Sequence, residues 1–284
     1  MPWQLLLGIS IIGEVIGRLL QRTIMKEDKS DPIAYAVIYQ IIGGIIIGIF
    51  ALVKGFQLPQ DITPILPNLL IMPVLYAITN ICMFTALKKT EASIFTILFA
   101  SYSIWLIVGS IFVFREPFSF LQIIGTVLIL LSVILVSWKH KNIKIGRAEL
   151  ITLSGAIVFA AAILNDTIIL QKGFDPASYL SISFLAPGLF LWLLYPKRTK
   201  EIVAIGKSAA VKKVILMAFI YGIVTLTYYY AFLFGKNAAQ IASINQINTV
   251  LTVIAAVIIL KERSHLLLKL SAVAMSFVGV LLVS

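Results

Sequence analysis

The sequence predicts an all-α integral membrane protein whose ten transmembrane helices form two inverted five-helix repeats. Three observations support this fold class: the composition, the ten apolar runs and an internal recurrence. Of the 284 residues, 60% are hydrophobic and 12% are charged, whereas soluble domains carry roughly 25% charged residues. A water-soluble fold of this size could not hide so much apolar surface, because folded proteins leave much of their surface exposed. A bilayer removes that conflict.

Ten apolar runs are each near the length of about 20 residues that a helix needs to cross a bilayer. Their uninterrupted apolar character favours helices over the alternating strands of a membrane barrel. Charged or proline-containing segments separate them. The expected spans are 3–25, 32–53, 64–87, 92–114, 117–138, 148–170, 176–195, 213–235, 238–260 and 266–284.

The basic residues are distributed unequally between the two sets of connections. Seventeen Lys and Arg residues belong to the connections after odd-numbered spans, if Arg22 and Lys213 at the span edges are included, and four belong to those after even-numbered spans. The positive-inside rule places the basic side in the cytoplasm, so both termini are expected to face outward. This pattern of short basic loops indicates membrane topology and not nucleic-acid binding, despite the net charge of +11. The first run lacks a basic leader, so we expect no cleavable signal peptide.

An internal repeat divides the chain into units at 1–138 and 148–284, joined by a linker at 139–147. Each unit holds five expected spans, so tandem units must enter the membrane in opposite orientations. The alternative is an ancestral duplication in a purely structural subunit. The recurring residues are Asp31-Pro32-x-x-Tyr35 with Asp175-Pro176-x-x-Tyr179, Thr23-Ile24 with Thr167-Ile168, Gly44 with Gly188, and Glu116 with Glu262.

The sequence contains no pattern typical of an enzyme, a metal centre or an ATP-driven pump. Cys82 is the single cysteine, so no internal disulfide is expected. His140 and His265 fall in connecting segments, where solvation or lipid headgroups explain them better than metal binding. No phosphate-binding loop is present. We therefore expect no catalytic residues and no cofactor.

One charged pair lies in the middle of an apolar span. Glu14 is near the centre of the first run, where an unpaired carboxylate costs several kcal/mol. Ser10, Glu14, Gly17, Arg18 and Gln21 share one helical face. Two interpretations stay open: Glu14 and Arg18 couple transport to protons or substrate, or they form a structural ion pair at i, i+4.

Polar and aromatic residues in other spans are candidates for substrate binding. The ninth span clusters Asn245, Asn248, Thr249 and Thr252 on one face, which either lines a cavity or makes interhelical hydrogen bonds. Aromatic rings with hydroxyls suit an organic solute, although packing or an interfacial belt is the alternative. The further candidates are Tyr76, Asn80, Tyr102 and Tyr228.

Small residues predict close helix packing at Gly44-x-x-x-Gly48 in the second span and along Ser93, Thr96, Ala100 and Ser103 in the fourth. Asn165-Asp166 aligns with Gln21-Arg22 of the first unit. Because Asp166 and Arg22 carry opposite charges, a gate between them is a further hypothesis.

These features resemble the drug/metabolite transporter superfamily, and within it the ten-span proteins with two EamA-type domains. The resemblance covers nearly the whole chain and rests on the ten spans, the five-plus-five repeat, and Glu116 and Glu262 after the fourth span of each unit. It implies a secondary transporter of small metabolites, often an exporter, with a central cavity and alternating access. Members are usually described with cytoplasmic termini, which contradicts the charge count.

The first span adds a finer likeness. Gly13-Glu14-Val15-Ile16-Gly17 is similar to the first helix of the small multidrug-resistance proteins, where a membrane glutamate exchanges protons against cationic substrates. This resemblance assigns that role to Glu14. The sequence departs from the pattern at Arg18, one turn later, and at Val158 in the second unit.

The sequence therefore predicts a secondary active transporter that moves a small organic metabolite or drug-like solute across the plasma membrane, with proton-coupled export as one form. Its expected partners are that solute and membrane lipids, with no nucleic acid, and it is expected to be a monomer or homodimer. The alternatives are a non-transporting subunit of a lipid-flipping or lipid-modifying complex, and a passive facilitator.

Overall fold

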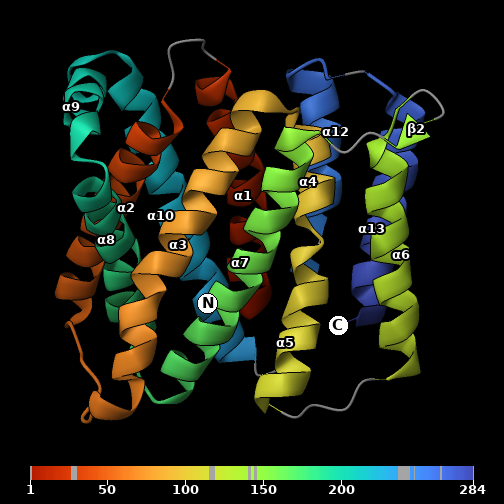
Figure 1. Ribbon diagram of the computed structural model, residues 1–284. Coiled ribbons are helices and arrows are strands. Elements are labelled where there is room, and N and C mark those ends of the chain that lie inside the picture. Colours follow the sequence, from red (N-terminus) through yellow and green to blue (C-terminus); the bar gives the residue numbers. More distant parts are fainter. Residues whose placement is uncertain are drawn as a thin grey trace.

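The protein is a bundle of roughly antiparallel helices (Figure 1). The computed structural model describes residues 2–26, 31–114, 119–139, 142–143, 146–235, 244–245, 247–262 and 264–283. The described helices are α1 (Trp3–Met25), α2 (Pro32–Lys54), η1 (Thr63–Ile65), α3 (Leu66–Lys89), α4 (Ala92–Phe99), α5 (Tyr102–Phe114), α6 (Phe120–Ser137), α7 (Arg147–Gln171), α8 (Pro176–Leu194), η2 (Pro196–Arg198), α9 (Thr199–Lys207), α10 (Ala210–Gly235), α12 (Ile247–Ile259) and α13 (Leu266–Val283).

Six of the described helices are long and apolar enough to cross a membrane: α1, α2, α3 with η1, α7, α8, and residues 210–231 of α10. The described parts of the other expected spans are shorter apolar helices. The expected helix positions along the chain are thus confirmed in outline. The total of ten spans stays a prediction, because parts of the fifth and ninth spans lie outside the described residues.

Two helices begin at the recurring Asp-Pro motif. The Asp31 carboxylate accepts hydrogen bonds from the backbone nitrogens of Ile33 and Ala34 at the start of α2. The Asp175 carboxylate accepts one from the Ser178 backbone nitrogen at the start of α8. Asp is a favoured N-cap, and proline suits the first helical position because its missing N–H would have no partner there. The repeated motif is therefore a repeated helix start.

The prediction of an unbroken fourth span was wrong. The chain forms two helices, α4 and α5, which are separated by a turn at Ala100 and Ser101. At the turn the backbone nitrogens of Ser101, Ser103 and Ile104 bond three residues back, to Leu98, Ala100 and Ser101. The Ser101 and Ser103 hydroxyls donate to the carbonyl oxygens of Leu98 and Ala100, at 2.7 and 2.8 Å. Serine side chains thus satisfy backbone groups where the helix tightens.

Two connections hold structure that the sequence did not predict. The segment between the seventh and eighth expected spans contains the short helix α9, which packs against α2 and α10 and buries part of Ile202 and Ile205. The linker contains a small antiparallel pair of two-residue strands, β1 (Trp138–Lys139) and β2 (Asn142–Ile143). Both lie at the upper end of the bundle (Figure 1).

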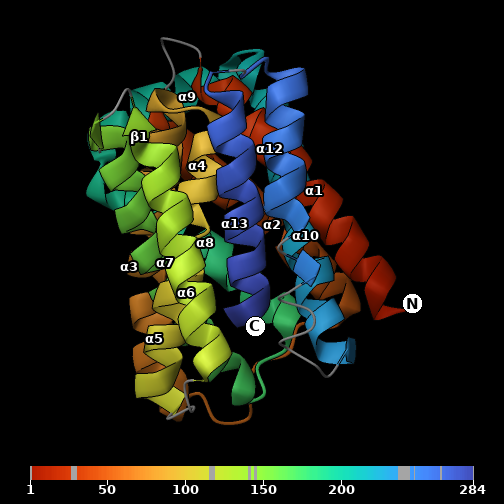
Figure 2. The same cartoon turned by 90° about the vertical axis from the view of Figure 1, so that its right-hand side faces the viewer.

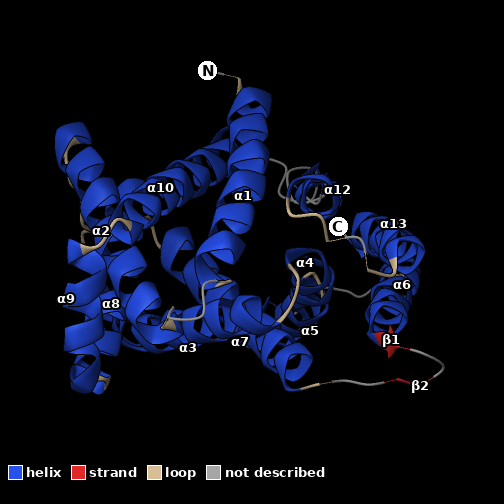
Figure 3. Ribbon diagram, turned by 90° about the horizontal axis from the view of Figure 1, so that it is seen from above, coloured by secondary structure: helices blue, strands red, loops and turns tan. Residues whose placement is uncertain are grey.

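The most extensive helix interfaces all join the first half of the chain to the second. They are α2 with α8, α6 with α13, α1 with α10, and α3 with α7. Figure 2 shows α6 beside α13, and Figure 3 shows α1 between α10 on one side and α12 on the other. The two halves are therefore interlocked, and the buried core of each half is completed by helices of the other.

The interface between α2 and α8 is unusually close because of two glycines, as predicted for Gly44. A Cβ atom on Gly44 would lie 2.7 Å from the Leu185 backbone nitrogen, and one on Gly188 would lie 3.1 Å from the Ile41 backbone nitrogen. Each end of this interface carries an ion pair. Arg198 contacts the Asp31 carboxylate at 2.7 Å, and Lys54 contacts the Asp175 carboxylate at 2.5 Å.

Replacing Gly44 by Ala is expected to lower the free energy of unfolding by about 1–3 kcal/mol, the usual cost of overpacking. The new Cβ would meet the Leu185 side chain at 2.4 Å and its backbone nitrogen at 2.7 Å, so the helices must separate. Thermal unfolding of the purified protein in detergent would measure the change. Gly8→Ala is the matched control, since nothing lies within 4 Å of its Cβ position. Equal melting temperatures for the two variants would contradict the packing argument.

Candidate functional site

A carboxylate and an amide from opposite ends of the chain meet inside the bundle. The Asn248 side-chain nitrogen on α12 donates a hydrogen bond to Glu14 Oε2 on α1 at 2.7 Å. The Asn245 side chain also reaches toward the Glu14 carboxylate. Asn245 and Asn248 are both buried. Glu14, which the sequence predicted for coupling, therefore lies beside Asn245 and Asn248, which it predicted for substrate binding. We call these three residues and their surroundings the Glu14 site.

Arg18 lies one turn further along α1 and is also buried. Its guanidinium is 3.8 Å from Glu14 Oε1, which is the long end of ion-pair contact. The same group stacks over the Phe95 ring at 4.8 Å and the Phe99 ring at 5.7 Å. Arginine is weakly hydrated for a cation and stacks well on aromatic faces, so α4 supplies a surface that tolerates this charge in an apolar interior.

Aromatic side chains enclose the Glu14 site on its other sides. Tyr102 on α5 packs edge-on against Phe159 on α7, with ring centroids 5.2 Å apart. Tyr228 on α10 lies within electrostatic range of both Glu14 and Tyr102. These tyrosines come from both halves of the chain: Tyr228 lies near Glu14, and Tyr102 lies near Tyr228.

The two glycines that flank Glu14 serve helix packing. A Cβ atom on Gly13 would lie 2.6 Å from the Val224 side chain, and one on Gly17 would lie 2.8 Å from the Tyr221 ring. The Ser10 hydroxyl also donates to the Val224 carbonyl oxygen at 3.1 Å. The motif of two glycines around Glu14 thus brings α1 against α10, while Glu14 itself turns toward α12.

Two buried polar atoms near Glu14 have no hydrogen-bond partner among the described residues: Asn245 Oδ1 and Tyr221 Oη. A buried polar group without a partner costs about 1–3 kcal/mol. Such atoms are typical of a site where a ligand or water completes the hydrogen bonding.

The remaining polar residues of the predicted ninth-span face are buried beside this site. Thr249 donates to Asn248 Oδ1 at 3.2 Å, which orients the amide toward Glu14. Thr252 is buried one turn further along α12.

Tyr76 and Asn80 belong to a different place. The Asn80 side-chain nitrogen donates to the Tyr76 backbone oxygen on the same helix at 2.8 Å. The Tyr76 hydroxyl donates to Asp166 Oδ2 at 2.5 Å. The structure therefore does not bring this predicted pair together with the Asn and Thr residues of α12 in one hydrogen-bonded cluster.

The predicted contact between Arg22 and Asp166 is wrong. Asp166 accepts hydrogen bonds from three tyrosine hydroxyls, while Arg22 lies 3.5 Å from the Glu262 carboxylate. The two residues lie near the ends of α1 and α7, and those ends are on opposite sides of the bundle (Figure 1). Nothing in the local sequence marks the tyrosine cluster, because its members come from four separate helices.

A buried ionic cluster joins the two halves at the upper end of the bundle, and its first part is built on Glu262. The Glu262 carboxylate accepts hydrogen bonds from the Ala92 and Ser93 backbone nitrogens at 3.0 and 3.1 Å, and from the Ser93 hydroxyl at 2.9 Å. It caps the start of α4 from the other half, where helix dipole and free N–H groups favour an anion. This gives the acidic residue after the ninth span a structural role. Its counterpart Glu116 lies outside the described residues.

The second part of the cluster pairs Glu91 with Lys269. The Lys269 ammonium contacts the Glu91 carboxylate and donates to the Glu262 backbone oxygen at 2.9 Å. Burial raises the pKa of the Glu91 carboxyl, but the hydrogen bonds from Lys269 and Ser264 outweigh it and hold this pKa below its ordinary value. The Lys269 ammonium is itself buried, so removal of the Glu91 charge would leave it buried without a counter-charge.

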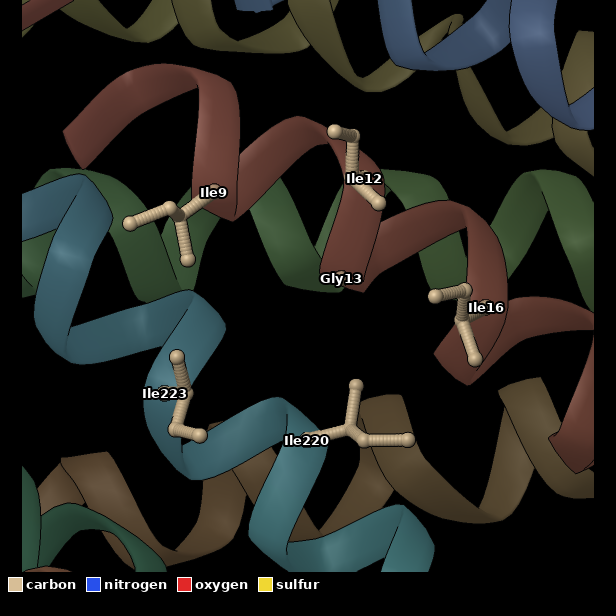
Figure 4. A pocket seen from close by; sticks show the side chains of 6 residues that line it. All are labelled: Ile9, Ile12, Gly13, Ile16, Ile220 and Ile223. Atoms are coloured by element: carbon tan, nitrogen blue, oxygen red, sulfur yellow. The ribbon is translucent and has the colours of Figure 1, made fainter. Parts of the chain in front are cut away.

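A separate apolar groove lies between α1 and α10. Its volume is about 260 Å³, and it is lined by Ile9, Ile12, Gly13, Ile16, Ile220 and Ile223 (Figure 4). Ile12 and Ile16 are exposed on the outer surface of the bundle. Without polar atoms in its lining, the groove offers nothing to orient a polar solute, and lipid chains are the natural filling in a bilayer. Within the described chain, no group of three His, Cys, Asp or Glu residues is placed to hold a metal ion.

Comparison with known proteins agrees with this architecture. The model of the EamA-like transporter family matches residues 2–138. This segment is an EamA-like transporter domain. The EamA-like domain belongs to the drug/metabolite transporter superfamily and contributes Glu14, Arg18 and the aromatic residues of α4 and α5. The chain is accordingly a multi-pass integral membrane protein, and its EamA-like segment points to transport.

The rest of the chain is related to known proteins through its fold. One solved protein structure matches with a TM-score of 0.56 and 13% sequence identity, over 96% of this chain and 97% of that chain. At this identity the match shows a shared fold across both halves, including the part after the EamA-like domain. No curated protein matches the sequence.

Acid is expected to weaken the ionic cluster through Glu91. Because its folded-state pKa lies below the unfolded value, its contribution to stability is complete above the unfolded pKa and is lost as pH falls through the folded pKa. Glu91→Gln should therefore lower the melting temperature at neutral pH. As the pH is lowered, the melting temperature of this variant should decrease less than that of the parent protein. Melting in detergent across a pH series would measure both effects.

Glu201→Gln on the surface helix α9 is the control for this experiment. Its nearest cation, Arg198, is exposed and 3.7 Å away, so the substitution should leave the pH profile unchanged. A Glu91→Gln profile parallel to that of the parent protein would exclude Glu91 as the source of acid sensitivity.

Proposed function

We propose that this protein is a secondary active transporter that moves a small polar organic solute across the plasma membrane by alternating access. The observation that carries this proposal is the Glu14 site. A partly buried carboxylate, a buried guanidinium and two buried carboxamides lie together inside a membrane bundle, where both halves meet. Ionisable groups at membrane depth are costly and are typical of substrate or ion pathways.

The contacts between the halves support two inverted repeats. Asp31 and Asp175 are 144 positions apart, as are Lys54 and Arg198, and each Asp pairs with the basic residue of the other half. The glycine contacts repeat in the same way, since Gly44 meets Leu185 and Gly188 meets Ile41. Equivalent contacts at the two ends of one antiparallel helix pair are expected when two five-span units insert in opposite orientations.

Alternating access requires one end of the site to be closed while the other opens. The cluster of Glu91, Glu262, Lys269 and Arg22 holds α1, α4 and α13 together at the upper end. The interruption between α4 and α5 lies next to Phe99 and Tyr102, which border the Glu14 site. Discontinuous helices at a repeat interface are common in transporters, because the break allows one segment to move relative to the other.

The solute is expected to bind against Asn245, Asn248, Thr249 and Thr252, with Tyr102 and Tyr228 as aromatic walls. The unpaired acceptor Asn245 Oδ1 favours a solute with hydrogen-bond donors. The basic loops predict that both termini face outward. Export is the proposed direction of flux, because it is what the resemblance to the drug/metabolite transporter superfamily implies.

Glu14 is the proposed coupling residue, because its carboxylate can exchange a proton for a substrate group, while Arg18 balances its charge. In proteoliposomes with an imposed pH gradient, the purified protein should accumulate or expel its solute. A thermal-shift screen of amino acids, sugars, nucleosides and quaternary amines would select that solute. Glu14→Gln should reduce proton-driven transport at least tenfold, because the neutral amide cannot release a proton.

Asp61→Asn is the matched control, since Asp61 lies on the exposed connection between α2 and α3. It should transport like the parent protein. Undiminished transport by Glu14→Gln with the same pH dependence would overturn the coupling role. Solute flux that ignores the pH gradient in the parent protein would indicate a passive facilitator instead.

A further inference from the structure

A buried carboxylate on α7 lies outside both the Glu14 site and the ionic cluster of Glu91, Glu262 and Lys269. Asp166 on α7 accepts hydrogen bonds from Tyr76 on α3 at 2.5 Å, from Tyr229 on α10 at 2.9 Å, and from Tyr179 on α8. The exposed fraction is 2% for Asp166 and 0% for Tyr179. Four helices therefore converge on one carboxylate, and one of them, α3, belongs to the first half of the chain.

The charge of Asp166 is not balanced by a cation among the described residues. The groups that face it are the hydroxyls of Tyr76, Tyr179 and Tyr229, and Tyr228 packs edge-on behind Tyr229 with ring centroids 5.9 Å apart. A buried carboxylate without a counter-charge is expensive. Three hydroxyl donors offset part of that cost but leave the negative charge in place.

The other neighbours of α7 do not supply a counter-charge. Asn165 is turned to Asn68, from which it accepts a hydrogen bond at 2.8 Å. The helices α4 and α5 meet α7 elsewhere, through ring contacts at Phe159 and at the close approach of Gly109 to Leu164. In the described chain, Asp166 thus faces hydroxyl groups alone.

The hydrogen bonds leave room for one small occupant. A carboxylate has about four lone-pair positions. Oδ2 uses two of them, for Tyr76 and Tyr229, and Oδ1 uses one, for Tyr179. Around the cluster, Tyr179 packs with Phe174 and other buried apolar side chains at van der Waals contact. The free position on Oδ1 is therefore suited to a proton.

We propose that Asp166 is a proton-binding site of this protein, distinct from Glu14. One proton adds to Oδ1 and converts the carboxylate into a neutral acid, and no other bond is made or broken. The new O–H needs an acceptor, so one tyrosine hydroxyl reverses its hydrogen bond to accept it. Because Tyr76 belongs to α3 and the other members to α7, α8 and α10, protonation changes how the first half is held by the second. A role in coupling rests on the transport function proposed above, whereas the proton site does not.

Infrared difference spectroscopy of the full-length protein in detergent, between two pH values, tests the proposal without any solute. The C=O stretch of a protonated carboxylic acid separates it from carboxylates and amides. Glu14 could contribute a similar band, so the test is made in Glu14→Gln. This variant should gain a buried carboxylic acid band on acidification, and the double variant Glu14→Gln with Asp166→Asn should lose that band. If the band persists in the double variant, or if no such band responds to pH in Glu14→Gln, the proposal is overturned.

Tyrosine variants keep the test decisive if Asp166→Asn does not fold. Tyr76→Phe and Tyr229→Phe each remove one donor that stabilises the carboxylate more than the acid. Each should move the midpoint of the band to higher pH, by on the order of one pH unit. Tyr195→Phe, on the exposed end of α8, is the control and should not move it. Unmoved midpoints in both cluster variants would also overturn the proposal.

The two proposals fail separately. If no solute is transported under any gradient while the Asp166 band behaves as expected, the transport function is overturned and the proton site stands. If transport is proton-coupled but the band does not depend on Asp166, the proton site is overturned and the transport function stands.

Discussion

The interlocking of the two halves determines the rest of this structure. The largest interfaces pair α1 with α10, α2 with α8, α3 with α7 and α6 with α13, so each half completes the core of the other. In an apolar solvent, helices associate through close packing and hydrogen bonds, since burial of apolar surface gives little advantage there. Gly44 and Gly188 provide the close approach, and the charged and amide groups of α1, α7 and α12 provide the hydrogen bonds. Glu14 and Asp166 both lie where helices of opposite halves meet.

Much of the fold could be predicted from the sequence because hydrophobic length is a direct physical requirement of the bilayer. The helix starts at Asp31 and Asp175 could also be predicted, because each Asp side chain caps its helix through backbone nitrogens only two or three residues away. The break between α4 and α5 was missed, because the apolar run through Ala100 and Ser101 shows no proline or glycine there. Helix α9 was read as a connection, because its nine residues are too few to cross a membrane.

The residues of the candidate site could be predicted from the sequence, but which of them contact one another could not. Glu14, Arg18 and Asn248 stand out as polar residues in apolar runs, but their contacts depend on which helices become neighbours. Tyr76 was predicted to bind substrate, and its hydrogen bond to Asp166 was not foreseen. The role of Glu262 as the cap of α4 joins residues 170 positions apart. A single sequence carries no sign of a contact between residues so far apart. Aligning the two halves places Arg22 opposite Asp166, but the equivalent ends of their helices lie on opposite sides of the bundle, so the alignment does not predict a contact.

The pairing of Glu14 with Asn248 also has a consequence for biosynthesis. The two residues are 234 positions apart, and ribosomes add about 5–20 residues per second. Helix α1 therefore waits in the nascent chain for roughly 10 to 50 seconds before its amide partner has been translated. During that interval the acid and the arginine one turn away are already on the same helix and can neutralise each other. The same two residues that make the mature interior polar thus allow the first helix to reside in the lipid or the insertion machinery until its partners arrive.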